Sequence, residues 1–381
     1  MAFKDILSDF PAREQFNYLS TASIGLVPNP VIEILKEHLI TLSQGGTASF
    51  DEELEVLVYG NLRKEGAKLF QCNPDDVAVF NSVSEAMNIV AWSLEIDTGK
   101  IVSTAIEHPV VTYPWLRIAW NKAVYVELIK AENWCIDIDD FLEKIDDQTK
   151  IVVLSHVEYL SGQRFDLARI SKKAHDVGAL FIVDGIQAAG YTPLDLEQWN
   201  VDVYITGSYK WLCAPFGSAI AYISKKLSDK ITPAFVGWRT PEDMWNFDAV
   251  NLSYASTARK FEYGTSGYGV KFGLTESIRY LQKLGIHNIT THNQKLVKLL
   301  LQELNTIKGI EIISPSTRGS ILTFRIEDKP VQKVGQRLRN LERPVEMSIR
   351  QGMIRIALHF YNTESDVAHL VENLKKILNE V

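Results

Sequence analysis

Two residue types that can do chemistry together, a carboxylate and an amine, follow two strand-like runs of the sequence. Asp184 ends the apolar run 180–183, and Lys210 stands shortly after the run 201–206. The first run has no polar alternation, which is typical of a strand buried on both faces of a parallel sheet. Ligands of open α/β sheets bind at the carboxyl ends of the strands. We therefore expect Asp184 and Lys210, 26 positions apart, to meet at one rim.

An acid and a lysine in one crevice suit the chemistry of pyridoxal phosphate. The lysine would form a Schiff base with the cofactor aldehyde, and the acid would keep the pyridine nitrogen protonated, so that the ring draws electrons. Gln187 could donate to the phenolic oxygen of the cofactor. The alternative is that Asp184 and Lys210 are solvated or salt-bridged surface groups, which both residue types usually are.

A candidate phosphate site lies upstream. The strand-like run 77–80 precedes the segment 82–85, which is expected to open a helix. The Ser84 hydroxyl, with the free backbone N–H groups of Val83 and Ser84, could hold a phosphate at that helix N-terminus. An ordinary serine N-cap is the alternative.

Composition restricts the classes of protein to which the chain can belong. It has 381 residues, enough for two domains, and a net charge of −7 with a pI near 5.7, which argues against nucleic-acid binding. The three cysteines, Cys72, Cys135 and Cys213, have no metal-ligand spacing, so no metal site is expected and a reducing compartment is favoured. The start lacks a secretory signal, and no apolar run approaches the roughly 18 residues that a membrane helix needs. We therefore expect a cytoplasmic protein without a membrane partner.

The elements that must position the candidate residues alternate between strand and helix patterns. Apolar spacing predicts helices at 31–44, about 52–70, 165–179 and 270–284, and strands at 101–108, 151–154 and 321–326. This order predicts an α/β fold: a large, mostly parallel-sheet domain at 15–258 and a smaller α+β domain at 259–381. The segment 1–14 could pack on the smaller domain.

Several short motifs together resemble one known family. They are D-G-x-Q-x-x-G from Asp184, P-L-D-L, V-D-V-Y, S-Y-K-W around Lys210, and P-F-G. In order and spacing they are similar to the class V aminotransferases, which include cysteine desulfurases, selenocysteine lyases and kynureninases. The resemblance extends from about Tyr18 to the C-terminal helix. It implies an aspartate-aminotransferase-like fold (fold type I), with Lys210 as the Schiff-base lysine, Asp184 as the pyridinium partner and Gln187 as the phenolate partner.

The resemblance implies roles for further residues. Ser84 and Val83 match the phosphate-binding turn, and Tyr209 stands where many desulfurases have a histidine and could bond the phosphate. His108, in an E-H pair, would stack on the cofactor ring and serve in proton transfer. A capping or core histidine remains the alternative for His108.

Two C-terminal motifs concern the partner subunit and the substrate. Thr265, in R-K-F-E-Y-G-T-S, matches a threonine that reaches the phosphate of the neighbouring subunit's cofactor, which implies a homodimer with shared active sites. Arg355, in the expected hairpin 345–358, matches the arginine that binds the substrate α-carboxylate. Arg350 is a weaker candidate for that task, and either arginine could instead form a salt bridge at the rim.

The chain departs from the cysteine desulfurases at two positions that matter. Tyr159 stands where many of them have an asparagine, which together with Tyr209 is closer to kynureninase-like members. The segment 341–355 has no cysteine where they carry the sulfur acceptor. We therefore expect a pyridoxal-phosphate enzyme that acts on an α-amino acid through Lys210, as an aminotransferase or a β-eliminating C–S or C–Se lyase without a persulfide cysteine.

Other readings stay open at this point. An epimerase or racemase, or a kynureninase-like hydrolase, would use the same residues. A catalytically silent cofactor-binding protein on the same fold, or a nucleotide-binding α/β protein, would not turn over amino acids.

Overall fold

A seven-stranded sheet forms the centre of the larger part of the molecule. The computed structural model describes residues 3–380. The strand order is β2-β8-β7-β6-β5-β3-β4, in which β8 is antiparallel to its neighbours β7 and β2 and the remaining pairs are parallel. The bounds are β2 (Val77–Phe80), β3 (Thr98–Thr104), β4 (Ala123–Ile129), β5 (Thr149–Ser155), β6 (Leu180–Asp184), β7 (Val203–Gly207) and β8 (Ala219–Ile223).

Helices cover both faces of this sheet because its central strands are apolar on both faces. In β6, Phe181 and Val183 pack on one side of the sheet and Ile182 packs on the other. The first side is covered by α3 (Glu52–Phe70), α7 (Leu167–Asp176) and α9 (Tyr268–Leu284), with α2 (Asn29–Gly45) packed against α9. The second side is covered by α4 (Val83–Ser93) and α5 (Pro109–Ala119). The short helix α6 (Ile138–Glu143) lies between β4 and β5, and the short helix α8 (Lys225–Ser228) follows β8.

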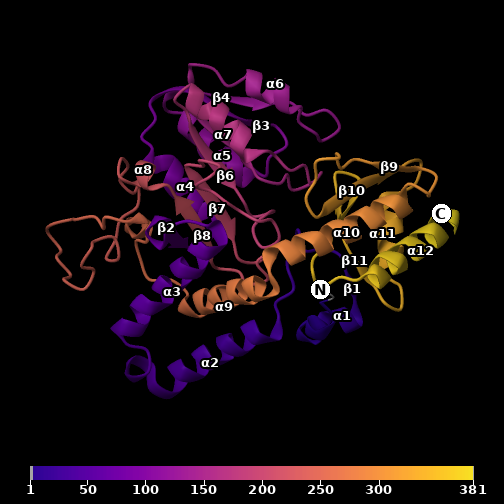
Figure 1. The fold of residues 1–381 in the computed structure, drawn as a ribbon, viewed down its shortest axis with the longest axis horizontal. Helices are drawn as coiled ribbons and strands as arrows, with labels where there is room; N and C mark the ends of the chain where they lie inside the picture. The colour runs from indigo at the N-terminus through magenta and orange to yellow at the C-terminus, as the bar shows by residue number, and fades with distance from the viewer. Residues whose placement is uncertain (1–2, 381) are drawn as a thin grey trace.

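A four-stranded antiparallel sheet forms the second, smaller part (Figure 1). Its order is β12-β13-β10-β9, with bounds β9 (Ile310–Ile312), β10 (Ile321–Ile326), β12 (Ser348–Arg350) and β13 (Met353–Ala357). One face packs on α10 (Ile286–Leu304), α11 (Val331–Arg339) and α12 (Glu364–Glu380). The expected α/β fold is confirmed, and the predicted boundary between residues 258 and 259 stays a prediction.

The N-terminal segment crosses from one part to the other. After a 3₁₀ helix (Phe3–Asp9) and α1 (Ala12–Gln15), the strand β1 (Asn17–Tyr18) pairs in parallel with β11 (Val345–Glu346). The chain then passes Lys210: the Gly25 N–H donates to the Tyr209 carbonyl at 2.8 Å. A Cβ at Gly25 would lie 1.9 Å from the Lys210 carbonyl oxygen, so only glycine fits this approach.

One predicted strand ends earlier than expected. The run 101–108 was expected to be extended throughout, but β3 ends at Thr104 and a turn follows. The reason is Pro109, which occupies the first turn of α5 and makes His108 the residue before the helix.

Candidate functional site

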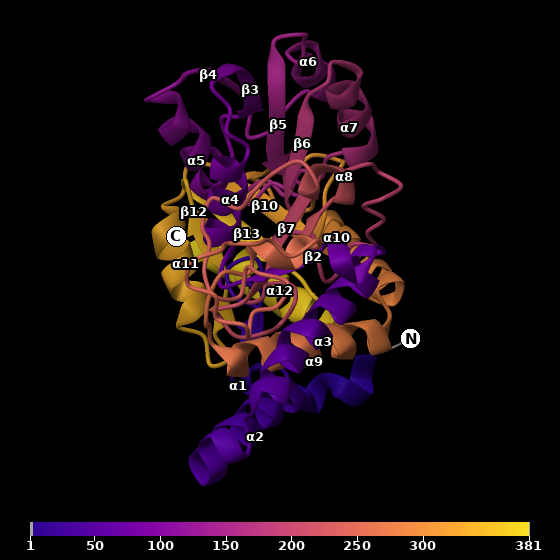
Figure 2. The ribbon, with the colours of Figure 1, turned by 90° about the vertical axis from the view of Figure 1, so that its left-hand side faces the viewer.

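Asp184 and Lys210 do meet at the carboxyl edge of the large sheet. The strands β6 and β7, labelled in Figure 2, are parallel neighbours with Asp184 opposite Ile205. The chain therefore leaves the sheet at the same rim after each strand. Asp184 is 1% exposed and accepts a hydrogen bond from the Ile186 N–H at 2.9 Å. Within residues 3–380, Lys210 forms no side-chain hydrogen bond or ion pair, and its Nζ lies 5.7 Å from the centroid of the Tyr209 ring. A lysine held beside a buried acid without a bonding partner is not a structural ion pair.

Burial moves the pKa of both groups towards the neutral form. The pKa of Asp184 is raised to about 6, mainly by desolvation, against the lowering effect of Lys210. The pKa of Lys210 is lowered to about 8, again mainly by desolvation, with Arg355 and Arg350 lowering it further and Asp184 opposing them. An amine with such a pKa is a usable nucleophile and base near neutral pH.

The start of α4 provides a helix N-terminus at the same end of the sheet. Ser82 is the capping residue, since its hydroxyl accepts from the Glu85 N–H at 3.0 Å. The Glu85 carboxylate accepts in return from the Asn81 N–H. The N-cap is therefore Ser82 and not Ser84, which leaves the exposed Ser84 hydroxyl for another partner. The N-terminal N–H groups of α4 lack intrahelical acceptors and favour an anion.

A buried lysine fixes the position of this turn from beneath. Lys271, on α9, donates to the carbonyls of Phe80 and Gly217, both at 2.9 Å, and to Asn81 Oδ1 at 3.1 Å. Its side chain is fully buried, and desolvation lowers its pKa to about 8. Sequence patterning gave no sign of this role, because Lys271 lies in an amphipathic helix far along the chain.

Gln187 and Tyr209 lie beside the same rim but already have partners. Gln187 accepts from the Trp211 indole at 2.7 Å and donates to the Ala22 carbonyl at 3.0 Å, which leaves one amide hydrogen for a ligand. The Tyr209 ring stacks on Phe216 with centroids 4.3 Å apart. Their predicted contacts with the cofactor stay predictions.

His108 caps α5 and also faces the lysine. Its Nδ1 accepts from the Val110 N–H at 3.3 Å, so the capping alternative is realised. Its ring meets the Tyr159 ring edge to face, with centroids 5.7 Å apart. Desolvation is the main cause that lowers the pKa of His108, and the charges of Lys210 and Arg350 lower it further. The cap uses only Nδ1, so Nε2 stays available for a ligand.

Arg355 is held by segments that are far apart in the sequence. It is 2% exposed and donates to the Tyr159 carbonyl at 2.6 Å and the Ser23 hydroxyl at 2.7 Å, with a longer contact of 3.4 Å to the Ser348 hydroxyl. Its Nε is buried without a partner among the described residues. Burial lowers its pKa to about 10, and Glu158 opposes this. Ser23 and Ser348 were not predicted, and no local sequence signal could have identified them.

Two buried acids lie beneath this arrangement. Glu107 accepts from the Ser155 N–H at 2.9 Å and from its hydroxyl, and burial raises the pKa of Glu107 to about 8. Glu158 accepts from the Leu160 and Ser161 N–H groups, and burial raises its pKa to about 7. The sequence pattern identifies Glu107 only as the residue before His108, and it predicts no role for Glu158.

Thr265 lies beside the turn that precedes α4. It is exposed, accepts from the Trp238 indole at 3.2 Å, and lines a small hollow with Asn81 and Glu85.

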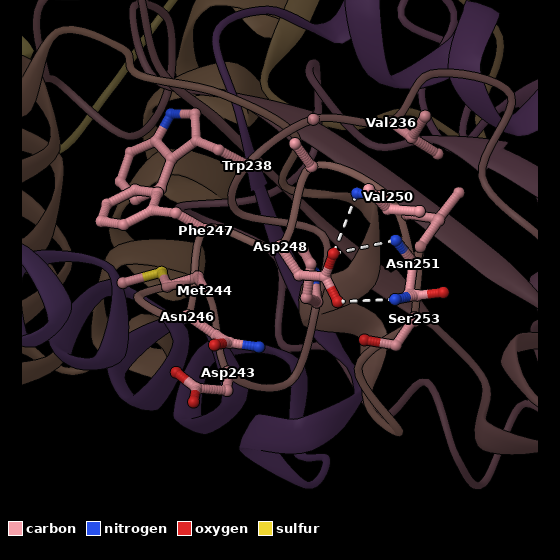
Figure 3. Close-up of a pocket in the computed structure, with 14 residues that line it drawn as sticks. Val236, Trp238, Asp243, Met244, Asn246, Phe247, Asp248, Val250, Asn251 and Ser253 are labelled. Carbon is pink, nitrogen blue, oxygen red and sulfur yellow. Dashed lines mark hydrogen bonds between the residues drawn. The ribbon is translucent and has the colours of Figure 1, made fainter.

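The irregular segment 229–257 folds over its own hollow of about 600 Å³, lined by residues from 236 to 253. Figure 3 shows Asp248 at its centre, accepting from the Val250 and Asn251 N–H groups. Neither Asp184 nor Lys210 lines that hollow.

The residues present fit pyridoxal phosphate. The α4 N-terminus suits a phosphate, Asp184 has one carboxylate oxygen without a bond among the described residues, and the Lys210 amine is unpaired. Within residues 3–380, no cluster of His, Cys, Asp and Glu could hold a metal ion, and no helix is long and apolar enough to cross a membrane.

Comparison with known proteins agrees with this geometry. The family model "Aminotransferase class-V" matches residues 17–370. The chain is 27% identical to an uncharacterized aminotransferase of Bacillus subtilis, over 96% of this chain and 95% of that protein. It is also 27% identical to a probable cysteine desulfurase of Methanothermobacter thermautotrophicus, over 99% and 98% of the two chains.

Solved structures share the fold. The cysteine desulfurase of Thermococcus onnurineus aligns with a TM-score of 0.90 at 22% identity, covering 100% of this chain and 99% of that one. The cystine C-S lyase C-DES, solved with its product cysteine persulfide, aligns with a TM-score of 0.87 at 23% identity, covering 96% and 99%. The family match covers most of the chain and agrees with Asp184 and Lys210 lying at one rim. The chain therefore belongs to the aminotransferase class-V family and is a pyridoxal-phosphate-dependent enzyme.

Proposed function

We propose that the enzyme removes the α-proton of an amino acid with Lys210 as the base, and completes either a transamination or a β-elimination. The observation that carries this proposal is the unpaired Lys210 amine beside buried Asp184, with a pKa lowered to about 8. Pyridoxal phosphate, when bound, supplies an electron sink for the negative charge that forms at the α-carbon. Lys210 would hold the cofactor aldehyde and then move the proton.

The other residues of the rim have positioning roles in this proposal. Asp184 would hold a proton on the pyridine nitrogen, and Gln187 would donate its remaining amide hydrogen to the phenolic oxygen. The α4 N-terminus at Val83 and Ser84, with the Tyr209 hydroxyl, would bind the phosphate. His108 would lie over the ring, with Nε2 open for proton transfer.

Arg355 is the proposed site of the substrate α-carboxylate. Its Nε lacks a partner, and Nη1 keeps one hydrogen beyond its bond to the Tyr159 carbonyl, while the two hydrogens of Nη2 contact Ser23 at 2.7 Å and Ser348 at 3.4 Å. A carboxylate that accepts from Nε and replaces the long Ser348 contact on Nη2 would bind the guanidinium bidentately. Buried Glu158 balances part of its charge.

A persulfide step is not part of the proposal. Segment 341–355 has no cysteine, Cys213 is fully buried, and burial raises the pKa of Cys135, which disfavours its nucleophilic thiolate form. A β-elimination would therefore release the sulfur or selenium group without passing it to the protein.

We further propose a homodimer in which Thr265 reaches the phosphate of the other subunit's cofactor. Thr265 is exposed beside segment 229–257, which carries several exposed large apolar side chains: Phe235, Val236, Phe247, Val250, Leu252 and Tyr254. Exposed apolar surface of this kind marks protein interfaces. Val250, 87% exposed, is the best place for a charge. Light scattering on V250D should report a monomer, and a wild-type monomer at micromolar concentration would contradict the proposal.

One assay tests the catalytic proposal. The holoenzyme is incubated in D₂O with each amino acid, and α-deuteration is followed by NMR together with the products. A keto acid that keeps the substrate side chain indicates transamination, and a keto acid that has lost a β-substituent, with ammonia, indicates β-elimination. Exchange should be lost in K210A and retained in K225A, which removes an exposed lysine. Absence of exchange with every amino acid would refute the proposal.

A further inference from the structure

The β12–β13 hairpin carries a second arginine on the same face as Arg355. In its register Ser348 lies opposite Arg355, and Arg350 lies opposite Met353. Because side chains alternate along a strand, these four residues share one face of the small sheet. The other face carries isoleucines that pack beneath the helices of the small domain: Ile349, Ile354 and Ile356. Arg350 and Arg355 therefore both leave the hairpin on the side of the large sheet.

Arg350 acts on the groups proposed to do the chemistry. Its charge contributes to the lowered pKa values of Lys210, His108 and Arg355, in each case after desolvation. Its cross-strand neighbour Met353 belongs to a small apolar cluster against which Tyr159 packs, and the Tyr159 ring meets His108. Arg350 therefore lies on the side of the site where Tyr159 and His108 face each other.

The charge of Arg350 is not balanced by the protein. It is exposed, and within residues 3–380 it forms no ion pair or side-chain hydrogen bond. The acids that act on this region are Asp184, Glu158 and Glu107, and burial raises the pKa of each. Asp184 is assigned to the cofactor ring, Glu158 balances part of the charge of Arg355, and burial holds Glu107 towards its neutral form. The guanidinium of Arg350 is therefore a positive charge for which the described residues supply no anionic partner.

We propose that Arg350 binds a second anionic group on the substrate, so that the enzyme acts on amino acids whose side chain ends in a carboxylate. The inference rests on the proposed function, in which Arg355 holds the α-carboxylate. Diagonal cross-strand neighbours such as these two arginines lie about 7–8 Å apart, with a somewhat shorter distance between their Cβ atoms. That separation suits the two ends of a short dicarboxylic amino acid, and each guanidinium can bind its carboxylate bidentately.

Unreactive ligands test the inference on the holoenzyme. Glutarate and pentanoate have the same carbon chain but carry two carboxylates and one, respectively. Calorimetry on the wild type should give a dissociation constant for glutarate about 10- to 100-fold below that for pentanoate. This ratio corresponds to the usual free energy of hydrogen bonds to a charged group. R350Q should abolish this preference by weakening glutarate alone, and R350K should keep part of it. R355Q should weaken both ligands.

A matched variant controls for net charge. Arg337 lies on α11 in the same domain and pairs with Glu380 at 2.8 Å on the surface. R337Q removes the same charge and should leave both dissociation constants unchanged. An equal loss of glutarate affinity in R337Q would show a general electrostatic effect and overturn the assignment to Arg350.

The results separate this inference from the proposed function. Equal wild-type affinities for glutarate and pentanoate, or a preference that survives in R350Q, would overturn the inference. If neutral amino acids still exchange their α-proton in that case, the proposed function stands without it. If no amino acid exchanges, the proposed function itself fails, whichever carboxylate binds.

Discussion

The edge of the large sheet and the inner face of the small sheet contribute to the site in different ways. At the large sheet, Asp184 and Lys210 reach one rim because β6 and β7 are adjacent parallel strands. At the small sheet, Arg355 is held by Ser23 and Tyr159, which come from segments far away in the chain. The cofactor half of the site follows from strand order, whereas the substrate half depends on contacts between the two parts of the molecule.

This difference affects how each half responds to substitution. Strand ends stay in place when one polar side chain is removed, because the sheet core holds them. The guanidinium of Arg355 depends on a few hydrogen bonds, among which the Ser23 and Ser348 hydroxyls also bond each other at 2.9 Å. We therefore expect substitutions at the large sheet to lower kcat and substitutions at the small sheet to raise KM.

The largest expected effect is at Asp184. D184N keeps the size of the side chain but removes the charge that would hold a proton on the cofactor ring. We expect kcat to fall by about 10²–10⁴-fold, as for the loss of a group that controls a proton in the transition state, with KM little changed. Steady-state kinetics on the substrate found by the exchange assay measures this. D229N, which removes an exposed acid paired with Lys225, should have normal kinetics, and a D184N enzyme with the same normal kinetics would refute the role.

The second prediction concerns the substrate half. R355K keeps a positive charge but loses the planar fork, so kcat/KM should fall by about 10- to 100-fold, mainly through KM. Circular dichroism and cofactor content should stay normal, because the cofactor half does not depend on this side chain. A fall in kcat with an unchanged KM would contradict the division between the two halves.

The third prediction uses the pH dependence of stability in the large sheet. The pKa of Glu107 is raised from 4.5 to about 8 by burial, so the folded state favours its protonated form. The stability that this group contributes is present below about pH 4.5 and is lost as the pH rises through about 8. Residue 107 cannot ionise in E107Q. As the pH rises through that window, the free energy of unfolding of E107Q should therefore increase relative to that of the wild type, on the order of a few kcal/mol. Urea unfolding of the apoproteins at pH 5 and pH 9 measures the gain, and equal differences at both pH values would refute it.

The smallest expected effect is at Ser348. S348A removes a hydroxyl that contacts Arg355 at 3.4 Å and the Ser20 and Ser23 hydroxyls at 3.1 and 2.9 Å. A hydrogen bond of this kind contributes about 0.5–1.5 kcal/mol, so KM should rise about 2- to 10-fold. Kinetics on S348A beside S43A, an exposed serine of α2, isolates the effect. A fall in cofactor affinity in S348A would show that the two halves are coupled.

The sequence predicted the cofactor half more fully than the substrate half. Apolar runs without alternation placed Asp184 at a strand end, and motif order assigned Lys210, because both features are local. The runs at 77–80 and 321–326 became β2 and β10 with the predicted bounds. The end of β3 was wrong by four residues, because the effect of Pro109 on the helix start outweighed the apolar pattern before it.

What the sequence by itself determined is the set of elements and the identity of the reactive groups. Strand and helix periods, the lysine and the acid are properties of short segments, and short-range physics fixes them. The tertiary structure alone decided which side chains surround Arg355 and placed Lys271 beneath the α4 turn. These facts depend on strand register and on packing between residues more than 100 positions apart, where burial and hydrogen bonding select one arrangement that no local pattern encodes.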